Sequence, residues 1–109
     1  FNNDDRFDLL VNNFNNDSLV LLIGNNNGTF TRETTYFTGH ESAPKQLCVG
    51  DLNNDNRIDI ITANYGSDSI GILLGQDRGT FSNVKTYSTG HGSKPWSVAV
   101  GDFNNDSRL

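Results

Sequence analysis

Short apolar runs alternate with turn-forming residues along the whole chain. In the middle of the sequence, four runs of this kind predict short strands, the last of them more polar and suited to a sheet edge: QLCVGD (46–51), DIITANY (59–65), IGILLG (70–75) and TFSNVKTYST (80–89). The stretches GSDS (66–69) and QDRG (76–79) are turns, and Gly79 is expected at positive φ. No window shows helical spacing of apolar residues over three turns, so we expect four antiparallel strands and almost no helix.

The same pattern occurs twice and then begins again. When the sequence is shifted by 51 residues, segment 1–51 aligns with 52–102 without a gap, and 23 positions are identical. Repeats of this length are typical of propellers and solenoids. Four antiparallel strands per repeat favour the blade of a β-propeller, and a solenoid with three-stranded coils is the alternative. The chain therefore divides into three segments: a partial blade without its first strand (1–45), a complete blade (46–95), and the first strand (SVAVGD, 97–102) and loop of a third blade (96–109).

Composition narrows the possible partners. The formal net charge is −5, whereas nucleic-acid binding requires a basic surface, so no nucleic-acid partner is expected. No apolar run approaches the ~18 residues of a membrane span, so this segment is not expected to insert into a membrane. Cys48 is the only cysteine, which excludes a disulfide within the chain. Glycosylation sequons at Asn16, Asn27 and Asn105 mildly favour secretion.

The most distinctive chemistry lies in the loop DLNNDNRID (51–59). Alternate positions of a tight loop can direct oxygen atoms to one interior point, and this loop offers carboxylates, an amide and a backbone carbonyl. Hard oxygen ligands suit Ca²⁺, whereas Mg²⁺ demands stricter geometry and Zn²⁺ prefers His or Cys, which the loop lacks. The loop recurs in both partial blades, where each copy lacks one aspartate. The predicted calcium ligands are Asp51, Asn53, Asp55, Arg57 (through its carbonyl) and Asp59, with Asn2, Asp4, Arg6 and Asp8 in the first loop and Asp102, Asn104, Asp106 and Arg108 in the last.

The loop DLNNDNRID admits other interpretations than a calcium site. An Asx-rich turn with solvated charge is the alternative that composition leaves open. An EF-hand or a dockerin-type loop is excluded, because position 12 is Thr62 rather than an acid and the flanking segments are predicted strands. Catalytic carboxylates are expected once per protein rather than once per repeat. No nucleophile paired with a base is found, so we do not expect an enzyme.

The loop DLNNDNRID, the strand pair IITANY and IGILLG, and the GTF motifs (28–30 and 79–81) resemble the FG-GAP/VCBS repeat over the whole chain. That family builds the β-propellers of integrin α subunits and of many secreted proteins, and its acidic loop is a calcium-binding hairpin between the first two strands of a blade. The resemblance therefore implies calcium ligation by the complete loop, with a structural role for the ion.

The chain departs from the family pattern at two positions. Asn53 stands where many members have Asp, and Asn56 stands where Gly is common. Fewer negative charges should weaken the affinity, and extracellular modules of this general kind bind calcium at about 10⁻⁴ to 10⁻³ M.

Several residues outside the loop need an interpretation. His40 and His91 occupy equivalent places, and a structural loop contact is favoured over a metal ligand. Trp96 is expected to be wedged between blades rather than to stack on carbohydrate, and Cys48 to be a small buried residue. The two phenylalanines of the GTF motifs are expected to pack between neighbouring sheets; they are Phe30 and Phe81.

Together these features predict a calcium-stabilised segment of a secreted or cell-surface propeller that recognises a protein or glycan ligand, for example in cell adhesion. The alternatives are a propeller region attached to or forming an extracellular hydrolase or lyase, and a lectin with sugar pockets between blades. The chain begins with Phe1 rather than Met, so we expect a piece of a longer or processed protein. Because a closed propeller needs about 4 to 8 blades, we expect stability only with further blades of the same chain or through self-assembly.

Overall fold

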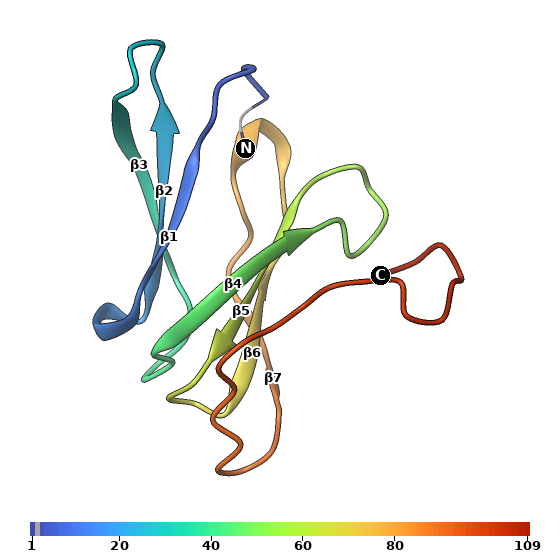
Figure 1. Ribbon diagram of the computed structural model, residues 1–109. Helices are drawn as coiled ribbons and strands as arrows, with labels where there is room; N and C mark the ends of the chain where they lie inside the picture. The colour runs from blue at the N-terminus through green and yellow to red at the C-terminus, as the bar shows by residue number, and fades with distance from the viewer. Residues whose placement is uncertain (2) are drawn as a thin grey trace.

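The computed structural model describes residues 1 and 3–109 of the chain and contains two antiparallel β-sheets (Figure 1). The first sheet has the order β1 (Leu9–Asn13), β2 (Ser18–Gly24), β3 (Phe30–Phe37). The second has the order β4 (Pro44–Gly50), β5 (Asp59–Asn64), β6 (Ser69–Leu73), β7 (Lys85–Ser88). Two single 3₁₀ turns, η1 (Phe14–Asn16) and η2 (Asp77–Gly79), are the only helical elements of the described residues. The expected all-β architecture of tandem antiparallel, propeller-type blades is confirmed.

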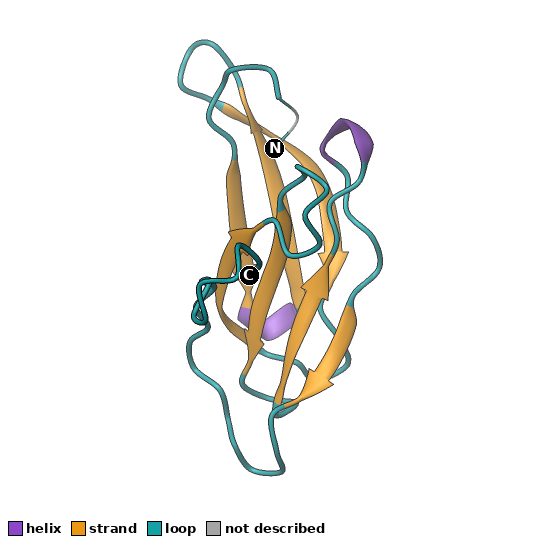
Figure 2. Ribbon diagram, turned by 90° about the vertical axis from the view of Figure 1, so that its right-hand side faces the viewer, coloured by secondary structure: helices purple, strands orange, loops and turns teal. Residues whose placement is uncertain are grey.

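Each sheet connects sequential neighbours, and the loops gather at the two ends of the strands (Figure 2). In the second sheet, Gly50 pairs with Asp59 and Val49 with Ile60, so β4 and β5 form a hairpin around the acidic loop. The predicted turns are confirmed, and Gly79 and Gly28 have φ values of 72° and 80°.

Two predicted strands differ in the structure. The run 80–89 is paired as a strand only over β7, and its first part contributes one isolated bridge from Phe81 to Gly75. Residues 97–102 form no strand, although their alternation matches that of β4. The reason is pairing: β4 is held by β5, which follows it, and no equivalent following strand lies within the described residues. Ser97 and Val98 are instead held by the side chain of Gln46, whose Oε1 accepts hydrogen bonds of 2.7 Å from both.

A single apolar cluster joins the two sheets. Leu19 and Leu21 of β2 pack with Ile60 of β5, Leu73 of β6 and Phe81, and all five are buried. Central strand β5 is buried at every position, because it has β4 and β6 on either side and the first sheet against its face. Each fully buried Leu or Ile contributes about 1.5–3 kcal/mol. This cluster fixes the two blades relative to each other and so sets the positions of their loops.

The prediction for the GTF phenylalanines is confirmed at one position and wrong at the other. Phe81 packs between the sheets, edge-to-face with Tyr36 of β3 at a centroid distance of 5.5 Å. Phe30, its equivalent in the first blade, remains 42% exposed, since the described residues contain no sheet on that side.

Candidate functional site

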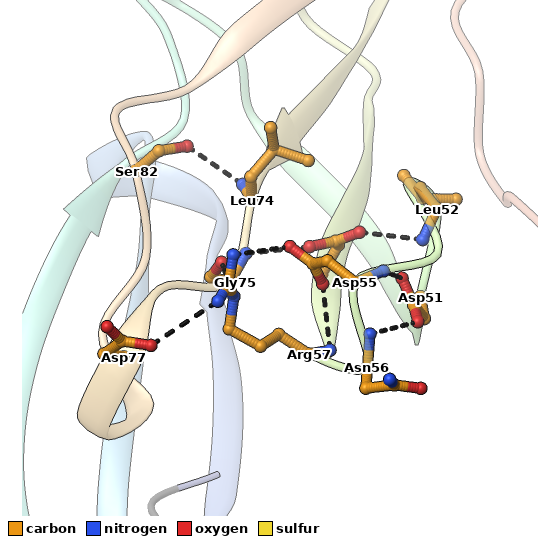
Figure 3. Close-up of polar contacts among 10 residues, drawn as sticks. Asp51, Leu52, Asp55, Asn56, Arg57, Leu74, Gly75, Asp77 and Ser82 are labelled. Carbon is orange, nitrogen blue, oxygen red and sulfur yellow. Dashed lines mark hydrogen bonds and ion pairs between the residues drawn. The ribbon is translucent and has the colours of Figure 1, made fainter.

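The acidic loop 51–58 connects β4 to β5 and is closed by hydrogen bonds to its own aspartates (Figure 3). Asn54 and Asn56 adopt φ values of 62° and 63°, the left-handed region that asparagine tolerates better than most residues. The equivalent residues of the other loops have the same conformation, with φ between 59° and 67°: Asn3, Asp5, Asn105 and Ser107. At these two positions all three loops therefore share a left-handed backbone conformation, although no two loops have the same sequence.

Asp51 organises the backbone of the loop from its first position. Its Oδ1 accepts a hydrogen bond from the amide of Asp55 at 3.1 Å, and its Oδ2 accepts one from Asn56 at 2.8 Å. In the last loop, the Asp102 carboxylate accepts bonds of 3.0 and 2.6 Å from the equivalent amides of Asp106 and Ser107. The first aspartate thus folds the chain back on itself before any cation is considered.

Asp55 is paired with an arginine side chain. Its carboxylate accepts the Arg57 amide at 2.9 Å and the Arg57 guanidinium at 2.7 Å. These contacts lower the pKa of Asp55; the Arg57 amide is the main cause, and a hydrogen bond from the Asn53 side chain and the guanidinium add to it. Arg57 Nε also donates to the carbonyl of Gly75 at 3.0 Å, so the guanidinium spans from the loop to the end of β6.

The same arginine–aspartate pair occurs in the partial loops. Arg6 contacts Asp4 at 2.6 Å and Arg108 contacts Asp106 at 3.0 Å. Sequence reasoning assigned these arginines a role only through their carbonyls, and the ion pair was missed. The signal was present, because Asp-x-Arg occurs in all three loops.

Asp59 occupies a different environment from the other loop acids. Its side chain is fully buried, and its two oxygens accept hydrogen bonds from the amides of Leu52 at 2.7 Å and Gly75 at 2.8 Å. In the first blade, Asp8 accepts equivalent bonds from Gly24 at 2.9 Å and from the Phe1 amino group at 2.6 Å. The ninth position therefore ties the start of the loop to the far end of the next hairpin.

The donor set fits calcium in chemistry, but the acids do not converge. Asp51, Asn53 and Asp55 lie together in the loop, and all offer oxygen ligands. Asp59 has both oxygens directed at backbone amides, and the Arg57 guanidinium donates a hydrogen bond to Oδ2 of Asp55. Within the described part of the chain, no three Asp, Glu, His or Cys side chains come close enough to hold a metal ion. Asn2, a predicted ligand of the first loop, lies outside the described residues.

The complete loop and the last loop face each other across an open hollow of about 530 Å³. Asp51 and Asn53 line one side, and Asp102 and Asp106 line the other. Three carboxylates and one arginine, Arg108, line this hollow, so its charge is net negative and a bound cation would offset it.

Two aspartates outside the acidic loops also have structural roles, which were not predicted from the sequence. Asp68, in the turn before β6, accepts hydrogen bonds from the amides of Gly92 at 2.7 Å and Lys94 at 2.9 Å. In the first blade, Asp17 accepts equivalent bonds from Glu41 at 2.9 Å and Ala43 at 2.8 Å. The repeated spacing between Asp-Ser and the Thr-Gly-His-x-Ser-x-Pro segment was the available signal. These carboxylates fix the connection from one blade to the next.

The exposure of individual side chains corrects three interpretations made from the sequence. His40 and His91 were expected to make structural contacts within their loops. In the structure both imidazole rings are exposed, and backbone amides of neighbouring residues, such as that of Gly92, hold the loop instead. Trp96 is 64% exposed rather than wedged between blades. Cys48 is only half-buried, and this burial raises the pKa of its thiol.

Acid should weaken the blade connection at Asp68. The amides of Lys94 and Gly92 lower the pKa of this carboxyl below its usual value of 3.8, so the stabilisation is present above that value and is lost as the pH falls through the lowered pKa. We expect Asp68→Asn to lower stability at neutral pH, and its difference from wild type to shrink as the pH falls below 3.8, as measured by urea unfolding. Asp5→Asn is the matched control because Asp5 is exposed and its equivalent in the complete loop is already Asn56. A constant difference between Asp68→Asn and wild type from pH 2 to 7 would contradict this assignment.

Among the described residues, neither helical element has the length or the apolar character of a membrane-spanning helix.

Comparison with known proteins places these features in a family. Comparisons with curated proteins and with solved structures find no match. The family model described as the FG-GAP-like repeat matches residues 1–62 and 51–109, which together cover the chain from end to end. With its two tandem sheets and its recurring acidic loop, the chain belongs to the FG-GAP-like repeat family.

Proposed function

We propose that this chain is a calcium-binding β-propeller segment of a secreted or cell-surface recognition protein, in which calcium has a structural role. The observation that supports calcium is the acidic loop, which recurs in all three repeats with the same two left-handed positions and offers only oxygen ligands. A bound ion would supply the positive charge that offsets the loop carboxylates. FG-GAP-like repeats are typical of extracellular proteins and are typically non-catalytic, which favours recognition, such as adhesion, over catalysis.

The complete loop would hold the ion through Asp51, Asn53, Asp55 and the Arg57 carbonyl. Asp59 would contribute through the free lone pairs of its amide-bonded oxygens. In the absence of the ion, the Arg57 guanidinium neutralises Asp55, so calcium has to compete with an internal cation. The partial loops offer fewer of these ligands: Asp4, Arg6 and Asp8 in the first, and Asp102, Asn104, Asp106 and Arg108 in the last.

Calcium should raise the thermal stability of the protein. With a Kd of about 10⁻⁴ to 10⁻³ M, about 10 mM calcium would stabilise the folded state by roughly 1.4–2.7 kcal/mol. The measurement is the Tm in calcium against the Tm in EGTA, with magnesium at the same ionic strength as the control. An unchanged Tm would overturn the structural-calcium proposal.

Two variants separate the roles of the loop residues. Asp51→Ala should abolish the calcium-dependent rise in Tm. Arg57→Gln keeps the carbonyl but removes the competing cation, so it should tighten calcium binding about 2- to 5-fold, as expected for loss of one exposed ion pair. Arg78→Gln is the control, because it removes an exposed arginine outside the loop. Equal calcium affinities for the two arginine variants would show that Arg57 does not compete with the ion.

The partner is proposed to be a protein or a glycan. Trp96 contacts Lys45 and Tyr65 but stays 64% exposed, and this exposed part of the indole ring favours the glycan-binding candidate because it can stack on a sugar. Glycan-array binding with wild type and Trp96→Ala, in calcium, distinguishes a propeller lectin from a protein-binding segment.

A hydrolase or lyase would need catalytic residues outside these repeats. Further blades of the same chain, or self-assembly, would cover the open sides of the two sheets, and analytical ultracentrifugation would detect the latter.

A further inference from the structure

The ends of the strands opposite the complete acidic loop carry a cluster of aromatic rings around one lysine. The Nζ atom of Lys45 lies 4.2 Å from the ring centroid of Phe14, 4.4 Å from that of Trp96 and 5.2 Å from that of Tyr65. Such distances are within the range at which a ring face attracts a cation. Among the side chains that the structure describes, which are all except those of residues 2, 32 and 33, none makes an ion pair or a hydrogen bond with this ammonium group. Within this set, the half-buried lysine is held by π faces.

The cluster follows the internal repeat. Phe14 and Tyr65 are 51 residues apart, as are Lys45 and Trp96, so two pairs of equivalent positions supply all four side chains. Each member of the second pair packs on the member of the first pair that precedes it: Lys45, at the start of β4, lies over Phe14, and Trp96 lies edge-to-face with Tyr65 at 5.8 Å. In Figure 1 the turn after β1, the start of β4 and the end of β5 lie near one another at the lower end of the sheets.

We propose that Phe14, Tyr65 and Trp96 form a cation-binding aromatic cage in which the Lys45 ammonium is the resident ligand. One ring comes from each of three consecutive repeats, so an occupied cage fixes how the repeats follow one another at this end. The cage takes alkylammonium groups as a class. Because the described side chains around the cage offer π faces and no hydrogen-bond acceptor to the cation, N-methylated ammonium fits it better than a primary ammonium, which loses hydrogen bonds to water on entering.

The position of the lysine can be tested in the intact wild-type chain. The protein has three lysines, Lys45, Lys85 and Lys94, and reductive ¹³C-methylation makes each of them visible by NMR without removing its charge. Lys45 faces three rings, whereas Lys85 lies near Tyr87 alone and Lys94 lies near one ring of the cage, Tyr65, at 4.9 Å. We expect the Lys45 methyl signal, assigned with Lys45→Arg, to be the most upfield of the three. A Lys45 signal at the position of free dimethyl-lysine would overturn the proposal.

The contribution of the charge can be measured with Lys45→Met, which keeps an unbranched apolar stem. We expect the equilibrium constant for unfolding to increase about 5- to 30-fold for loss of a cation shared by three rings. Lys85→Met removes the same charge from exposed strand β7 and should have a much smaller effect. In a Trp96→Leu background the effect of Lys45→Met should shrink, and an undiminished effect would contradict a shared cage.

The ligand class is tested by chemical rescue. Lys45→Ala removes the ammonium group shared by the three rings and leaves Lys94 near Tyr65 alone, and tetramethylammonium chloride should then restore stability relative to sodium chloride at the same concentration. Neopentyl alcohol has a similar shape without the charge and should restore less. The rescue should be lost when Trp96→Ala is added. Equal rescue by the two compounds, or none by the cation, would show that the rings form an ordinary apolar contact rather than a cation site.

Discussion

Replacing Asp59 with alanine is expected to destabilise the protein by about 3–4 kcal/mol, even in the absence of calcium. The carboxylate is fully buried and is the acceptor for the amides of Leu52 and Gly75. A hydrogen bond to a charged group contributes about 1.5–3 kcal/mol, and a buried donor left without an acceptor costs about 1–3 kcal/mol. The relief of burying one less charge offsets part of the total. Urea unfolding at pH 7 in EGTA measures the effect without any contribution from the ion.

Asp55→Ala is the matched control, because it removes a carboxylate of the same loop whose contacts are exposed to solvent. In EGTA, the loss for Asp55→Ala should be much smaller than for Asp59→Ala, whereas both should reduce the response to calcium. The loss of stability for Asp59→Asn should lie between those of Asp55→Ala and Asp59→Ala. Asparagine keeps one oxygen as an acceptor, but its amide NH₂ group replaces the other oxygen and faces a backbone N–H donor. Equal losses for Asp55→Ala and Asp59→Ala would show that Asp59 has only a metal-binding role.

The contrast between these two acids shows where sequence reasoning stops. The spacing of DLNNDNRID treats its aspartates as equivalent ligands, and the loop position between two strands was predicted correctly. The burial of Asp59 depends on Gly75, which is 16 residues away and reaches it only when β6 folds back along β5. Local spacing carries no information about such a contact, so the structural role of Asp59 could not be predicted.

The strands show a similar division between local pattern and tertiary context. The apolar runs located β5 and β6 within one or two residues. Strand β5 is buried at every position, and β6 is buried at alternate positions and half-buried at the others, so both strands consist mainly of apolar or small residues. The run 97–102 has the same pattern as β4, but a strand also requires a partner. The exposure of Trp96 and its contact with Lys45 likewise depend on how successive repeats are placed, which the sequence of one repeat does not specify.

Gly75 joins the acidic loop to the second hairpin in a way that requires the absence of a side chain. A Cβ atom at this position would overlap the carbonyl oxygen of Ile58 and lie 3.3 Å from Cβ of Arg57. In the first blade, a Cβ on Gly24 would overlap the carbonyl oxygen of Phe7 in the same manner. The glycine at this repeat position is therefore explained by close approach of two backbones, with the Gly75 amide bonded to Asp59.

Gly75→Ala is expected to cost about 3 kcal/mol, because a backbone carbonyl cannot rotate away as a flexible side chain can. Displacing Ile58 also moves Asp59 away from the Gly75 amide, so the substitution should increase hydrogen exchange across residues 51–59 and weaken calcium binding. Gly101→Ala is the control, since a Cβ there meets only the movable ring of Phe103 at 3.4 Å. Urea unfolding and hydrogen exchange measure both effects. If Gly75→Ala were as stable as Gly101→Ala, the acidic loop would not depend on its contact with the end of β6, and the strong effect expected of Asp59 would lose its structural basis.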